Sequence, residues 1–223
     1  MTLEKIYNGQ KDKRNLTEKV WYACYGSNLL EERFLCYIQG GQPNGAKTIN
    51  KGCRDKTLPT DSEDFYICSE LYFARNSGNW DNGGVAFIRT TFEPQASTLG
   101  RIYLISKEQL LDVAQQETNT ETELTIDFDK AISEESFTFK RRSWYGNLLY
   151  LGQHNDYPIF TLTNENDLQP LTKPSSNYLI TIINGLKETH NFDNNTIFEY
   201  LITKKGIADK YTDEELLNIV NNQ

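Results

Sequence analysis

Two parts of the sequence carry residue types that suit chemistry on a small molecule, and the first is a loop near the start. This loop comprises Tyr25, Gly26, Ser27, Asn28 and Leu29, between a short apolar run and a stretch with helical spacing. Glycine there permits a positive φ and lets a ligand approach the backbone closely. The helix that follows directs unpaired N–H groups and the positive end of its dipole outward. The loop therefore suits an anion or a developing oxyanion, although Gly-Ser-Asn is also common turn and cap chemistry.

The second part is a single carboxylate, Glu117. Leu110, Val113, Ala114 and Glu117 follow the i, i+3, i+4, i+7 spacing of one helix face, and that face is apolar. Partial desolvation and a position near the helix C-terminus would both raise the pKa of this carboxyl group. A raised pKa suits a general acid or base. The alternative is a surface glutamate at a fraying helix end.

The elements that must position these residues mix many strands with a few helices. The apolar run 20–25 predicts a buried strand. A helix is expected over 29–38, with Asn28 in its start signal and Glu31, Glu32 and Arg33 on its polar side. Ser106 predicts a capped helix that ends near Glu117.

The remaining segments complete the expected architecture. Strands are expected over about 65–74, 85–92, 99–105, 122–128, 136–142, 147–152 and 157–163, and helices from Ser176, Asn194 and Thr212. Residues 1–19 are expected to be a loose arm, 20–190 a folded domain with an insertion over about 40–63, and 191–223 a helical extension packed on that domain. We therefore expect an α+β protein built around a curled mixed sheet, closed or nearly closed as a small barrel.

Composition argues against several classes of function. The 223 residues include 31 acidic and 23 basic side chains, a net charge of -8, which disfavours nucleic-acid binding. No segment approaches the ~20 apolar residues of a membrane span, and no secretory signal is recognised. The four cysteines form no Cys-x-x-Cys pair, so the spacing of a zinc site is absent. Free thiols without a secretion signal indicate the cytoplasm.

Three segments, in this order, resemble the γ-glutamylcyclotransferase-like superfamily. They are the loop 25–29, the run Gly100–Leu104 with a helix ending Gln115-Gln116-Glu117, and Pro174-Ser175-x-x-Tyr178 opening a helix that continues through Ile182, Gly185 and Glu188. The matched span is about 20–190. We expect the nearest kin to be bacterial members with an insertion after the first helix and a helical tail.

The resemblance implies both a site and a reaction. In the superfamily, the loop matching 25–29 holds a γ-glutamyl group through backbone amides, the glutamate matching Glu117 is the acid/base, and the tyrosine matching Tyr178 lines the pocket. The α-amine of the substrate attacks its own γ-carbonyl, which releases an amine or amino acid and leaves 5-oxoproline. This transferase or lyase chemistry uses a small γ-glutamyl substrate and no metal or cofactor. The leaving amine and the oligomeric state stay open.

Some features depart from the superfamily and keep other interpretations open. Thr118 and Leu124 stand where relatives often have glycine and an aromatic residue. One alternative is a catalytically idle or ligand-binding member of the same fold. Another is a transferase that uses the thiol of Cys24 or Cys36, which would need a histidine partner.

Overall fold

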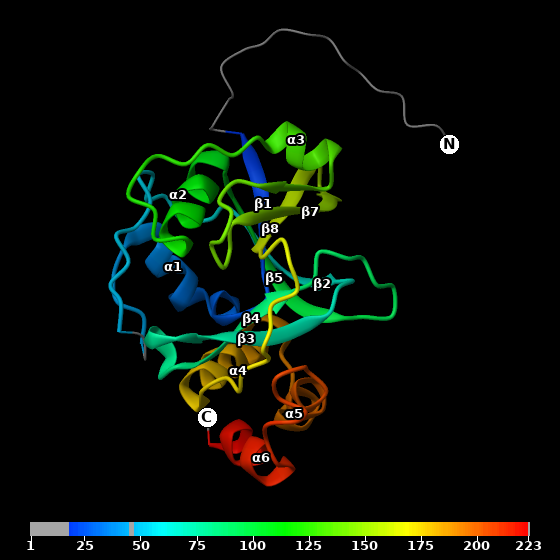
Figure 1. Ribbon diagram of the computed structural model, residues 1–223. Coiled ribbons are helices and arrows are strands. Elements are labelled where there is room, and N and C mark those ends of the chain that lie inside the picture. The colour runs from blue at the N-terminus through cyan, green and yellow to red at the C-terminus, as the bar shows by residue number, and fades with distance from the viewer. Residues whose placement is uncertain (1–17, 45–46, 223) are drawn as a thin grey trace, which may run out of the picture.

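A six-stranded mixed sheet forms the centre of the protein, and the computed structural model describes residues 18–44 and 47–222 (Figure 1). Its strands run in the order β2-β5-β1-β8-β7-β6, and β3 and β4 form a separate two-stranded sheet. The strands are β1 (Lys19–Cys24), β2 (Ser62–Ile67), β3 (Leu71–Ser77), β4 (Gly83–Ile88), β5 (Thr98–Ser106), β6 (Ser136–Thr138), β7 (Asn147–His154) and β8 (Tyr157–Thr163). The helices are α1 (Glu31–Gln39), α2 (Lys107–Glu117), α3 (Phe128–Ser133), α4 (Ser176–His190), α5 (Asn194–Ile202) and α6 (Asp213–Asn221), with 3-10 turns η1 (Ser27–Leu29) and η2 (Gly78–Trp80). The expected α+β class, with a curled mixed sheet and flanking helices, is confirmed.

Strand β1 lies in the middle of the sheet and is buried on both faces. It pairs antiparallel with β5 and parallel with β8. Tyr22 and Cys24 belong to an apolar cluster shared with α1, α2 and α3, whereas Trp21 and Ala23 belong to a second cluster shared with β3, β4 and α4–α6. Because successive side chains alternate between two buried faces, every residue of the strand after Lys19 is apolar. It ends where the loop 25–29 begins.

Three of the expected strands differ from the structure: one is divided, one is absent, and the segment 136–142 is a strand only over β6 (Ser136–Thr138). The segment 65–74 divides into β2 and β3, because the chain turns at Ser69, whose amide donates to the carbonyl of Ile67 at 2.8 Å. The segment 122–128 contains no strand, and α3 begins at its end. There the Asp127 carboxylate accepts a hydrogen bond from the Lys130 amide at 3.1 Å, which caps the helix. This cap outweighs the strand preference of the preceding β-branched residues.

The helical tail packs on the two-stranded sheet. Its apolar side chains Ile197, Leu201, Leu216 and Val220 are fully buried in the same cluster as β3 and β4. The Phe73 amide in β3 donates to the carbonyl of Lys205 at 2.9 Å. Residues 1–17, expected to be a loose arm, lie outside the described residues.

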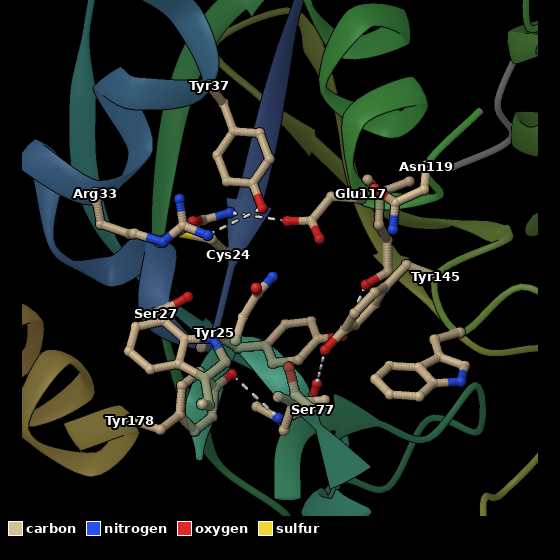
Figure 2. A pocket seen from close by; sticks show the side chains of 18 of the residues that line it. Cys24, Tyr25, Ser27, Arg33, Tyr37, Ser77, Glu117, Asn119, Tyr145 and Tyr178 are labelled. Atoms are coloured by element: carbon tan, nitrogen blue, oxygen red, sulfur yellow. Dashed lines mark hydrogen bonds between the residues drawn. The ribbon is translucent and has the colours of Figure 1, made fainter. Parts of the chain in front are cut away.

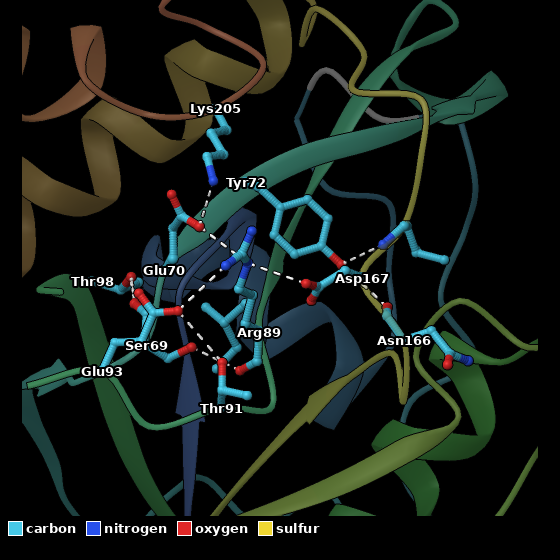
Figure 3. A network of polar contacts seen from close by, with 12 residues as sticks. Ser69, Glu70, Tyr72, Arg89, Thr91, Glu93, Thr98, Asn166, Asp167 and Lys205 are labelled. Atoms are coloured by element: carbon cyan, nitrogen blue, oxygen red, sulfur yellow. Dashed lines mark hydrogen bonds and ion pairs between the residues drawn. The ribbon is translucent and has the colours of Figure 1, made fainter.

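Charged side chains add a second connection between the tail and the hairpin (Figure 3). Lys205 pairs with Glu70 at 2.9 Å, and Glu70 pairs with Arg89 at 3.1 Å. Arg89 also reaches Asp167 at 3.3 Å. The tail, the β3–β4 hairpin and the segment after β8 are therefore joined by one network. Within the described residues, no helix has the length and apolar character needed to cross a bilayer.

Candidate active site

A pocket of about 330 Å³ opens beside the end of β1 (Figure 2). Seven separate parts of the chain line it: the end of β1 with its loop, α1, the end of α2, the β3–β4 hairpin, the segment before β7, β8, and the start of α4. Of the predicted site residues, Tyr25, Gly26, Ser27, Asn28, Glu117 and Tyr178 line this pocket. Its volume falls in the usual range for small-molecule sites.

The loop has a different local structure from the one expected. Gly26 has a φ of -119°, so a positive φ is not what requires glycine here. Residues 27–29 form the 3-10 turn η1, α1 begins only at Glu31, and the side chain of Asn28 turns toward the pocket instead of capping the helix. The amides of Leu29 and Leu30 are already bonded to the carbonyls of residues 26 and 27. These two amides are therefore not available to a ligand, and within the loop the amides of residues 26–28 are the remaining candidates.

Tyr178 explains why residue 26 is glycine. A Cβ atom at Gly26 would lie 2.8 Å from the Tyr178 hydroxyl oxygen and 3.3 Å from the Cβ of Ala86. That hydroxyl accepts a hydrogen bond from the Ala86 amide at 3.1 Å, and the ring packs against Trp80 with centroids 4.9 Å apart. Ser175 caps α4 by accepting from the Tyr178 amide at 3.3 Å, which fixes the position of the ring at the helix start.

Glu117 reaches the pocket from the last turn of α2, as its spacing predicts. Ser106 and Gln109 form a reciprocal capping box at the other end of this helix. Leu110 and Val113 on the same face are fully buried, while Glu117 itself is half-buried at the pocket wall. Asn28 donates to its carboxylate at 3.4 Å.

The environment of Glu117 perturbs its acidity in two opposing ways. Burial raises the pKa of Glu117 above the usual value for glutamate. The nearby Arg33 charge and the hydrogen bonds from Tyr37 and Asn28 lower the pKa in part. The net direction is upward, as general acid/base work requires.

Part of the insertion braces the end of α2. The described residues of 40–63 do not line the pocket. Instead Arg54 holds Asp112 at 2.9 Å, and the Gly52 amide donates to the side chain of Gln116 at 3.2 Å. The insertion thus supports the turn of helix that carries Glu117.

Arg33 and Tyr37 are pocket residues that the sequence patterns did not single out. Arg33 was expected on the polar side of its helix, but it is 8% exposed and lies against Tyr37, with its guanidinium carbon 4.7 Å from the ring centroid. The stripe formed by Arg33, Phe34, Tyr37 and Ile38 is buried as a unit. The signal that could have found Arg33 is its position four residues before Tyr37, at the edge of that apolar stripe.

Aromatic side chains and neutral polar groups complete the wall. Trp80 and Trp144 line it together with Tyr145, whose hydroxyl donates to the Ala86 carbonyl at 2.8 Å. Burial raises the pKa of Tyr145 well above its usual value and raises that of Tyr178 to about 12, so both stay neutral. Arg33 and Glu117 are the charged side chains among the lining residues that the structure describes.

Leu29, also predicted to bind substrate, does not line the pocket. Its side chain is 1% exposed in the core, and a Cβ atom at Gly185 of α4 would lie 2.5 Å from the Cβ of Leu29. Its carbonyl accepts from Arg101 at 3.3 Å, and Arg101 also pairs with Glu31 at 3.1 Å and with Glu188. The loop, β5 and α4 are therefore clamped together at Leu29, which positions the pocket without touching it.

The thiols do not form a nucleophilic site. Cys24 lines the pocket, but burial raises the pKa of its thiol to about 12. Cys36 lies outside the pocket, and neither His154 nor His190 lines it. Without a histidine partner, a thiol of this kind is inert. Among the described residues, no group of three or more histidine, cysteine or acidic side chains could hold a metal ion.

Comparisons with known proteins bear on the fold. No family model matches the chain. A protein of Arabidopsis thaliana named histone deacetylase 5 is 34% identical over 189 residues, but the match covers 76% of this chain and 28% of the plant protein. The chain therefore spans less than a third of the length of the plant protein that it matches.

Solved structures are similar to this chain as well. A structure of a gamma-glutamyl cyclotransferase has a TM-score of 0.51 at 15% identity, covering 92% of this chain and 100% of that one. An uncharacterized protein from Homo sapiens has a TM-score of 0.49 at 18% identity, covering 92% of this chain and 99% of that one, which is too weak to carry an argument. The chain has the γ-glutamylcyclotransferase-like fold.

Proposed function

We propose that this chain, which has the γ-glutamylcyclotransferase-like fold, is an enzyme that cyclises a γ-glutamyl amine or γ-glutamyl amino acid. The α-amine of the substrate attacks its γ-carbonyl carbon, and a new carbon–nitrogen bond closes the five-membered ring of 5-oxoproline. The original amide bond then breaks, and the amine leaves. Atoms balance without water or a co-reactant.

Glu117 supplies the proton transfers in this proposal. As a carboxylate it takes a proton from the α-ammonium group so that the amine can attack, and as a carboxylic acid it gives a proton to the leaving nitrogen as the amide bond breaks. The ring nitrogen then loses its second proton, again through Glu117, to the released amine, which leaves as an ammonium ion. A carboxyl group with a raised pKa is suited to both steps. Backbone amides of residues 26–28, on the facing side of the same pocket, are the proposed donors to the developing oxyanion.

One observation carries the proposal: residues far apart in sequence meet at one small pocket. The loop 25–28 follows β1, Glu117 lies on α2 and Tyr178 lies on α4, and all of them line the same cavity. A glutamate at a fraying helix end would not be half-buried on a pocket wall with an asparagine donor 3.4 Å away. The open cavity beside Glu117 also favours an enzyme over a catalytically idle protein, in which neighbouring side chains would fill this space.

The test is a panel of γ-glutamyl compounds, with release of 5-oxoproline measured by chromatography. We expect turnover of at least one compound, and a fall of ~10²–10⁴ in kcat for Glu117→Gln. Glu108→Gln is the matched control, because Glu108 lies on the same helix, pairs with Arg54 and does not line the pocket. Failure of the whole panel would contradict the proposal, and full activity of Glu117→Gln would remove Glu117 from the mechanism.

A further inference from the structure

Arg33 is a buried cation whose hydrogen-bonding capacity is largely unused. Its Nη2 donates to the Tyr37 hydroxyl at 3.2 Å. Its Nε and Nη1 have no hydrogen-bond partner in the part of the chain that the structure describes. The residue is 8% exposed and lines the pocket, and Figure 2 shows the guanidinium directed inward from α1. A buried charge in this state costs free energy unless something pairs with it.

Two neighbours limit what that partner can be. The Oδ1 atom of Asn28 is also buried without a hydrogen-bond donor among the described residues. Its amide orientation is set by Glu117, because the Nδ2 group donates to that carboxylate and an oxygen there would be repelled. The pocket thus offers unpaired donors on Arg33, an unpaired acceptor on Asn28, and a carboxylate on Glu117.

The Arg33 donors, the Asn28 acceptor and the Glu117 carboxylate together suit a ligand group that carries one negative and one positive charge side by side. A carboxylate is the bidentate partner that guanidinium geometry fits. An ammonium group fits between an amide oxygen and a carboxylate. A multiply charged anion such as phosphate would be repelled by ionised Glu117. An α-amino-acid head group has the required pair of charges.

We propose that Arg33 binds the α-carboxylate of the substrate and that Asn28 Oδ1 and Glu117 receive its α-ammonium group. The assignment rests on the proposed function only in naming the γ-glutamyl unit as the owner of this head group. The other lining groups carry no charge, so the leaving group is expected to be an uncharged amine portion. Arg33 then selects the substrate head group, while Glu117 moves its proton.

The test uses small ligands that cannot cyclise: L-norvaline, butylamine, which lacks the carboxylate, and pentanoate, which lacks the ammonium group. Binding is followed by the fluorescence of Trp80 and Trp144, which line the pocket, and by calorimetry. We expect L-norvaline to bind the wild-type protein at least about 10-fold more tightly than butylamine, as for a hydrogen-bonded charge pair. Arg33→Met should reduce this ratio to about one, and Arg33→Lys should retain part of it.

The control is Arg141→Met, because Arg141 is an exposed arginine that does not line the pocket. It should keep the wild-type ratio. An unchanged ratio in Arg33→Met, or equal or absent binding of the three ligands to the wild-type protein, would overturn the assignment. Should Arg33→Met fail to fold, the preference for L-norvaline over butylamine in the wild-type protein and in Arg33→Lys still tests the assignment. A preserved preference for L-norvaline without any 5-oxoproline production would refute the proposed reaction and leave the Arg33 assignment standing.

Discussion

Replacing Gly26 with alanine should break a specific hydrogen bond at the pocket, and its cost follows from the geometry. The new Cβ atom would lie 2.8 Å from the Tyr178 hydroxyl oxygen, closer than such atoms pack. The ring cannot move freely because it packs against Trp80 and Phe73. The hydroxyl must therefore leave the Ala86 amide, now 3.1 Å away, and that buried N–H loses its acceptor. The expected loss is ~1–3 kcal/mol of unfolding free energy, or roughly 2–4 °C in Tm per kcal/mol for a chain of this length.

A double-mutant cycle isolates this bond. Tyr178→Phe removes the hydroxyl, so it should cost a similar ~1–3 kcal/mol by itself. It also removes the shortest contact of the added Cβ, because the next Tyr178 atom is 4.0 Å away, while the Cβ of Ala86 at 3.3 Å remains. Gly26→Ala should therefore cost less in the Tyr178→Phe background than in the wild-type protein, and the difference is the coupling energy of the bond. Urea denaturation measures all three variants. Gly78→Ala is the control, since a Cβ there meets nothing within 4 Å. Additivity within ~0.5 kcal/mol would refute the reasoning.

Three further predictions concern acidity, thiols and the clamp at the loop. Burial raises the pKa of Glu117, and the base must be ionised, so kcat/KM should begin to fall with decreasing pH above the range of an ordinary glutamate. Arg33→Met removes a positive charge that lowers this pKa, so it should shift the acidic limb of the profile to higher pH. An unshifted limb would show that Arg33 does not influence the pKa of Glu117. Iodoacetamide at pH 8 should label exposed Cys68 and spare Cys24, whose thiol pKa is raised to about 12, as peptide mass spectrometry would show; equal labelling would contradict the buried position of Cys24. Arg101→Met should lower the unfolding free energy by ~1.5–3 kcal/mol, because the arginine side chain is 10% exposed and bonded to two carboxylates, and a urea midpoint equal to that of the wild type would count against the clamp.

The elements that local rules control were predictable from the sequence. The capping box at Ser106 and the apolar spacing up to Glu117 fix both the start of α2 and the face that carries the carboxylate. The run 20–25 reads as a buried strand because every residue is apolar, and β1 is indeed buried on both faces. A resemblance in three segments supplied the expectation that the loop, Glu117 and Tyr178 share one site.

What depends on contacts between distant segments could not be predicted. Arg33 looks like a surface residue in sequence, since only the approach of the end of α2 and of the loop encloses it. Gly26 was explained by a positive φ, whereas the real reason is the Tyr178 hydroxyl, 152 positions further along by residue number. The cap at Asp127 was missed because the β-branched residues before it favour a strand.

Because the helical tail is bonded to β3, the tail and the β3–β4 hairpin should open together when the protein unfolds locally. The Phe73 amide depends on the Lys205 carbonyl, and Lys205 also holds Glu70. The same hairpin presents Ala86, whose amide holds Tyr178 at the pocket. Hydrogen exchange reports such shared opening, since amides in one cooperative unit become exposed together. The amides of Phe73 and Ala86 should therefore show the same free energy of opening, and a molecule that binds α6 would alter the pocket by changing how often this unit opens.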